Sequence, residues 1–329
     1  MSKYYKFLII ISIIGLLLII VLSIFAGQQK ISLIDVFKVF FSKDYDEINY
    51  LIIKKIRIPR IVASLLVGAA LSISGAVLQG IFDNPLASPY LLGISNGAGF
   101  TASIAIILGL SGLYLQIFAF FGGIIAFLLA ILFSYFFKSK GSISIIIGGI
   151  LIGNFFAALT MYIKLIADPL AKLPSIVYWL MGSFVNVTEK SLIIPFFLIL
   201  FSSIILIMLS WKLNILAFGD IHARSLGEKP FLLKLIVLIT TTIATSAAIS
   251  ICGIIGWIGV VIPQLARFKT SNDFRKLLPI SILWGASYTC FVDSLARMFF
   301  KYELPAGLVS SIIGIPFAAF ILSRRKNDF

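Results

Sequence analysis

Runs of about 20 apolar residues recur along this chain, separated by short polar segments. A run of that length is what an α-helix needs to cross about 30 Å of hydrocarbon. We expect an all-α integral membrane protein with one transmembrane domain over residues 1–329 and both termini in the cytoplasm. Hydropathy and helix breakers predict ten spans, the eighth too short to cross as regular helix, near residues 7–26, 61–81, 90–110, 114–137, 142–165, 191–210, 232–252, 254–266, 279–299 and 305–323.

The composition excludes an ordinary soluble protein, because 60% of the residues are apolar and only 12% are charged. The first apolar run, residues 7–26, is longer than the core of most signal peptides, so we predict a retained helix. Cys252 and Cys290 lie in apolar stretches without CxxC spacing, and His222 is the chain's one histidine. Neither a disulfide framework nor a metal site is therefore indicated.

The basic residues set the expected orientation. With both ends cytoplasmic, fifteen of the 27 Lys and Arg residues face inward, as the positive-inside rule favours. Seven of the other twelve crowd the outer segment from Lys30 to Arg60, which either tolerates them or meets an acidic partner. The net charge of +14 does not indicate a nucleic-acid partner, because the basic residues form no basic domain or stripe.

Two interruptions differ from ordinary loops. Residues 80–89 contain Pro85 and Pro89, and the stretch 252–263 carries glycines at every third position before Pro263. Such breaks serve either helix packing or transport, since paired interrupted segments in two halves are typical of transporters with internal pseudo-symmetry.

Charged residues within the predicted spans are few. Asp293 and Arg297 lie four residues apart on the ninth span and so on one helix face. This spacing predicts either a mutual salt bridge at the outer helix end or a role in transport. No zinc-protease, serine-hydrolase or nucleotide-binding motif occurs, and no acid, base and nucleophile set lies at membrane depth. We therefore expect no enzyme activity, and any ATP chemistry to belong to another chain.

The cytoplasmic segment at about residues 216–231, between the sixth and seventh spans, is long enough for two short helices. Asp220 lies early in a helix, where an acid suits the helix dipole, and Gly227 is placed as a C-cap. Periodicity alone leaves two interpretations open, an ordinary interfacial loop or a docking segment.

Several motifs together resemble the FecCD-type permease family, the membrane subunits of type II ABC importers for ferric siderophores, haem and cobalamin. Their order and spacing, rather than any one of them, carries the resemblance. The matching stretches are RIPR at 57–60 with VGAALSISGAVLQ at 67–79, NPLASPYLLG at 84–93, YWLMGS at 178–183, GWIGVVIPQLAR at 256–267, and LPAG at 304–307 through GIP at 314–316.

The resemblance implies a subunit in the cell membrane that dimerises with a second copy or a related chain around a translocation path. It also implies two ATPase subunits that carry ATP and Mg, an outer substrate-binding protein, and no cofactor in this chain. It assigns a coupling segment that docks on the ATPase to Gly219, Asp220, Ala223, Arg224, Leu226 and Gly227.

Two further assignments follow from the resemblance. Arg57, Arg60 and Arg297 match positions where the family uses outward arginines to hold acidic residues of the binding protein. Ser142, Ile143 and Ser144 match the place where the family narrows the path at its cytoplasmic end. Serine at a helix start is also an ordinary cap.

The chain departs from the family pattern at Gln264, Ile254 and Phe274, where His, Pro and His are frequent. These departures leave the substrate open among ferric siderophores, haem and cobalamin, with an iron chelate as the default. The alternative function is an ion-coupled secondary transporter that uses Asp293.

Overall fold

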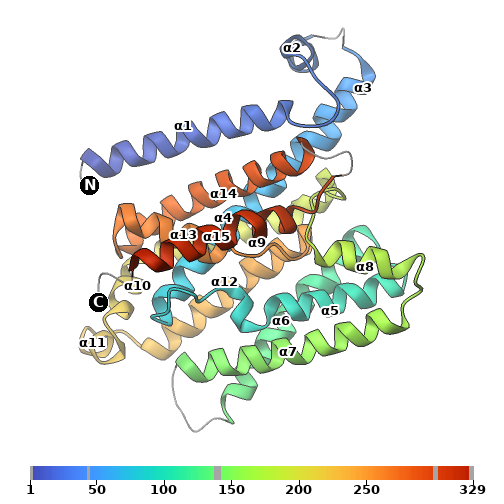
Figure 1. Cartoon of the computed structure of the whole chain (residues 1–329). Coiled ribbons are helices and arrows are strands. Elements are labelled where there is room, and N and C mark those ends of the chain that lie inside the picture. The colour runs from blue at the N-terminus through green and yellow to red at the C-terminus, as the bar shows by residue number, and fades with distance from the viewer. Residues whose placement is uncertain (1–2, 43–44, 137–141, 299–302, 326–329) are drawn as a thin grey trace.

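The computed structural model of the chain describes residues 3–42, 45–136, 142–298 and 303–325. Within these ranges every regular element is a helix, which confirms the all-α class. The long helices pack side by side in one bundle, and α1 (Lys3–Phe25) lies along its edge (Figure 1).

A helix overlaps each of the ten predicted spans. After α1 come α4 (Ile58–Ile81), α5 (Ile94–Ile107), α6 (Gly112–Ser134), α7 (Ser142–Ile166), α9 (Glu189–Met208), α12 (Pro230–Cys252), α13 (Ile258–Thr270), α14 (Phe274–Met298) and α15 (Ala306–Arg325). Among the described residues, six helical segments are long and apolar enough to cross a membrane. The chain therefore passes the membrane several times, while a count of ten crossings stays a prediction.

Helices α4 and α12 form the centre of the bundle, since 78% of the most apolar window of each is buried. Small residues let the neighbours of α4 come close. A Cβ at Gly68 would lie 2.1 Å from the carbonyl oxygen of Gly285 on α14, and one at Gly75 would lie 1.9 Å from that of Gly259 on α13. Glycine at these crossings is therefore a packing requirement.

The two ends of the bundle differ in their short helices. Helices α10 (Ser210–Ala217) and α11 (Asp220–Ser225) lie at one end, where α1 and α7 begin and α15 finishes (Figure 1). Helix α8 (Lys172–Leu180) lies at the opposite end. We name these the inner end and the outer end, following the predicted orientation.

The chain between α1 and α4 is more structured than the hydropathy predicted. It forms α2 (Leu33–Phe41), α3 (Glu47–Tyr50) and the π-helical η1 (Leu51–Arg57), which continues directly into α4. The second span was predicted to begin near residue 61, but its helix begins at Glu47. The lysines of η1 interrupt the apolar run without breaking the helix, which is why hydropathy alone placed the start too late.

Candidate functional site

The predicted coupling segment is a helix–turn–helix at the inner end. Gly219 joins α10 to α11 with a φ of +97°, a conformation that favours glycine. After α11, the N–H of Gly227 donates to the carbonyl of Arg224 (3.0 Å), and that of Glu228 donates to the carbonyl of Ala223 (3.0 Å). This pair of hydrogen bonds is a Schellman motif, so Gly227 ends the helix as the sequence predicted.

Few contacts hold α11 on the bundle. Ala223 is fully buried in the apolar cluster of the inner end. Asp220 forms an ion pair with Lys234 of α12 at 2.7 Å, and Glu228 forms one with Lys212 of α10 at 3.0 Å. These anchors fix the orientation of α11 and leave its other face open.

That open face is strongly apolar. Phe218, Ile221 and Leu226 are 76%, 83% and 65% exposed, and nothing lies within 4 Å of a Cβ placed at Gly219 or Gly227. Arg224 is exposed beside them. A turn with three protruding apolar side chains, open space at its glycines and an exposed arginine can enter a groove on another protein.

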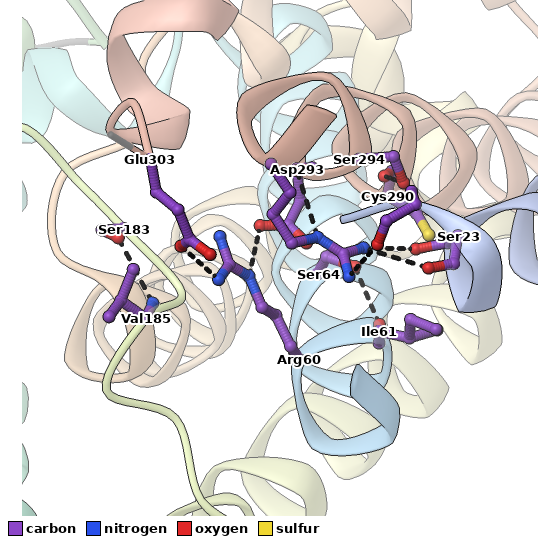
Figure 2. A network of polar contacts seen from close by, with 12 residues as sticks. Ser23, Arg60, Ile61, Ser64, Ser183, Val185, Cys290, Asp293, Ser294 and Glu303 are labelled. Atoms are coloured by element: carbon purple, nitrogen blue, oxygen red, sulfur yellow. Dashed lines mark hydrogen bonds and ion pairs between the residues drawn. The ribbon is translucent and has the colours of Figure 1, made fainter. Parts of the chain in front are cut away.

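The outer end carries a buried charge cluster. Arg60 on α4 donates to Asp293 on α14 at 2.8 Å and to Glu303, which follows α14 in the chain, at 2.7 Å. Figure 2 shows the Arg60 guanidinium between these two carboxylates. Arg297 also pairs with Asp293, at 3.1 Å, which confirms the salt bridge predicted from the four-residue spacing.

The arginines at this end also hold α1 and the segment after it in place. Arg297 donates to the Ser23 hydroxyl (2.7 Å) and the Ala26 carbonyl (3.1 Å), and Arg57 donates to the carbonyls of Ile24 and Gln29. Carbonyls near a helix C-terminus carry partial negative charge, so arginine suits this position.

Arg57, Arg60 and Arg297 are each only 3% exposed. They line a cavity of about 530 Å³ at the outer end together with Glu303 and Tyr178. Their guanidinium groups are thus bound by other groups of this chain. A binding protein would meet them at the cavity rather than on the open surface. Their predicted docking role stays a prediction.

The sequence indicated the Asp293–Arg297 pair but missed Arg60 and Glu303 as its neighbours. The partners lie 233 and 243 positions from Arg60. One sequence feature could have indicated Glu303. It directly precedes the LPAG motif and so lies at the end of a span rather than in a remote loop.

The two interruptions meet inside the bundle. Gln79 at the end of α4 donates to the Gly259 carbonyl (3.3 Å), and Gln264 donates to the Gln79 side-chain oxygen (2.8 Å) and the Pro85 carbonyl (3.2 Å). The Tyr90 hydroxyl, in the 3₁₀-helical η2 (Pro89–Leu92), donates to the Ile255 carbonyl. Side-chain amides thus satisfy the backbone groups that the broken helices expose. This contact gives Gln264, a departure from the family pattern, a structural partner.

The predicted gate lies at the inner end, where α7 begins at Ser142. Ile143 is 65% exposed and Ser144 is 3% exposed, while the side chain of Ser142 lies outside the described part. The segment thus lies at the same end of the bundle as α10 and α11, and its gating role stays a prediction. In the described residues, no group of His, Cys, Asp and Glu side chains could hold a metal ion.

The chain matches known transport proteins over nearly its whole length. Residues 15–324 match the model of the FecCD transport family. A molybdate import system permease of Haemophilus influenzae is 35% identical over 95% of this chain and 94% of its own length. A probable iron chelatin transport system permease of Helicobacter pylori is 39% identical over 84% of each chain. A solved metal-chelate type ABC transporter in an inward-facing conformation is 33% identical, with a TM-score of 0.88 over 96% of this chain and 98% of its own.

Proposed function

This chain belongs to the FecCD transport family, and we propose that it is the permease subunit of a binding-protein-dependent ABC importer that carries a metal chelate into the cytoplasm. It is a multi-pass protein of the cell membrane. The open apolar face of α10–α11 carries the proposal, because a chain without a nucleotide-binding motif needs a surface that transmits work from an ATPase.

The proposed partners follow from this role. Two ATPase subunits that bind Mg and ATP dock on the coupling segment, and a second copy or a related chain completes the translocation path. An outer binding protein delivers substrate at the cavity lined by Arg57, Arg60 and Arg297. The segment Ser142–Ser144 narrows the path at the inner end.

The substrate class is proposed from the relatives. Their names include an iron chelatin, haemin, vitamin B12 and molybdate, and the solved neighbour is a metal-chelate type transporter. A ferric siderophore is the first substrate to test, with haem and cobalamin next.

The first experiment asks what accompanies the chain. Purification of the tagged chain in mild detergent should recover an ATPase at two copies per two membrane chains, and the number of membrane sequences would separate homodimer from heterodimer. A stable chain that comes out alone, even after gentle crosslinking, would contradict the proposal.

A second experiment tests the coupling surface directly. Leu226→Gln replaces an exposed apolar group without altering the Gly227 turn, so we expect the chain to fold normally. We expect its complex with the ATPase and the binding protein to lose most ATP-driven uptake in proteoliposomes. Ile48→Gln is the matched control, because Ile48 is 61% exposed at the other end, on α3. Equal uptake by both variants would count against docking at α10–α11.

The alternative, an ion-coupled secondary transporter, rests on the buried carboxylate of Asp293. Two arginines already bind this carboxylate, which suits a structural ion pair better than a site that must bind and release an ion. Uptake that continues without an ATPase and stops when the ion gradient is collapsed would favour this alternative.

A further inference from the structure

Helix α2 is a well-formed helix that none of the sites above uses. The Ser32 side chain accepts from the N–H of Asp35 (3.1 Å), and the Ser32 N–H donates to the Asp35 carboxylate (3.0 Å). This reciprocal capping box fixes the start of α2. On the side of α2 that faces η1, Val39 is 6% exposed and packs with Ile53. This contact gives the helix a defined orientation.

The opposite side of α2 is a continuous apolar face that the described chain leaves uncovered. At 100° per residue its members fall within an arc of about 120°. The Phe37 and Phe41 rings contact each other at a tilt of 32°, with centroids 4.9 Å apart. The exposed members are Leu33 (74%), Ile34 (67%), Phe37 (62%), Phe40 (43%) and Phe41 (78%).

The place and direction of α2 indicate what covers this face. Figure 1 shows α2 end-on, beside the C-terminal end of α1, whereas α1 runs across the page. Helix α1 is apolar and only 11% of its window is buried, so lipid surrounds most of it. Its C-terminal end therefore marks the outer boundary of the bilayer, and α2 lies at that level with its axis across the direction of the spans.

Lysines flank the apolar face. Lys38 is exposed at its edge, and the Lys54 amine lies 4.4 Å from the centroid of the Phe40 ring. Arg57 and Arg60 are buried and bound within the chain. Lys55 of the outer basic cluster found in the sequence pairs with Glu189. Lys38 and Lys54 lie around α2, where their charges can reach lipid phosphates.

We propose that α2 is an interfacial anchor that lies in the outer boundary of the bilayer, with its apolar face among the acyl chains and its lysines at the phosphates. The occupant is lipid because α2 lies near the C-terminal end of α1, a helix that is itself mostly exposed and apolar, as a lipid-facing span is. An aromatic apolar face edged by lysine is the pattern of helices that lie in the membrane plane. The proposal depends on the membrane location of the chain and is independent of which substrate it carries.

The test uses the full chain reconstituted in lipid nanodiscs that contain anionic lipid. A spin label on Phe37→Cys is compared with one on Lys38→Cys, with Phe41→Cys as a second position on the apolar face. The native Cys252 and Cys290 are buried, so exposed engineered thiols should label selectively. We expect the ratio of collisions with oxygen to collisions with a water-soluble nickel complex to be several times higher at Phe37 and Phe41 than at Lys38.

Two results would overturn the proposal. Strong collision with the nickel complex at Phe37 and Phe41 would place the face in water. Exclusion of both reagents from these positions would show that protein, a second copy of the chain or another subunit, covers α2.

Discussion

The buried charge cluster at the outer end and the coupling segment at the inner end differ in how they hold charge and apolar surface. At the outer end, Arg60 and Arg297 are buried, and the groups they bind lie within the chain. At the inner end, α11 presents Ile221 and Leu226 to solvent and is held by half-exposed ion pairs. A buried ion network resists rearrangement, whereas a lightly anchored apolar turn suits a contact with a moving partner.

The largest expected effect breaks the outer end. Asp293→Ala leaves Arg60 and Arg297 buried without their shared partner, so we expect the free energy of unfolding to fall by about 3–5 kcal/mol. Thermal unfolding of the purified chain in detergent measures this. The matched control is Glu189→Gln, which removes an exposed pair with Lys55 at the same end and should cost less than about 1 kcal/mol. Similar losses of unfolding free energy in both variants would show that the buried cluster contributes no more to stability than an exposed ion pair.

A middle-sized effect concerns the link between α10 and the start of α14. Partial burial raises the pKa of Asp273, but hydrogen bonds from Arg275 and Asn214 outweigh it and hold the pKa below its ordinary value. A lowered pKa means that the contribution to stability is complete above the unfolded pKa and is lost as the pH falls through the folded one.

We therefore expect Asp273→Ala to lower the free energy of unfolding by about 1–2 kcal/mol at neutral pH. The difference from the unaltered chain should shrink as the pH falls below about 4. Unfolding curves of both proteins across this range provide the measurement, and a difference that does not change with pH would show that the carboxylate charge is irrelevant.

The smallest effect on stability lies in the anchor of α11. Asp220→Asn weakens the pair with Lys234, which is partly exposed, so stability should change by less than about 1 kcal/mol. ATP-driven uptake should fall more than stability, because the pair orients the docking helix. The combination sharpens the comparison, since Glu189→Gln at the outer end should leave both stability and uptake little changed. Full uptake by the Asp220→Asn variant would show that the Asp220–Lys234 pair is not needed for coupling.

Local patterns predicted much of the fold. Apolar length and breakers located a helix at each expected span, and the positions of Asp293 and Arg297 predicted their ion pair. The C-cap at Gly227 was likewise predictable, because a glycine after a short helix supplies the left-handed conformation that the turn needs.

Other features depended on contacts between distant parts of the chain. Arg60 was predicted to face outward, and hydropathy does not indicate that Asp293 and Glu303 would come within hydrogen-bond distance of it. The contact of Gln79 with Gln264 and the position of α2 beside the end of α1 belong to the same class.

The sequence by itself thus determined a multi-pass helical membrane protein of the FecCD transport family, because hydropathy, breakers and motif spacing act over a few turns of helix. The tertiary structure decided which charges are buried and which apolar faces stay open. The burial of charges and the exposure of apolar faces depend on how helices far apart in sequence pack together. At Gly68 and Gly285 two such helices approach so closely that neither position has room for a Cβ. A buried charge is tolerated only where that packing brings its partner.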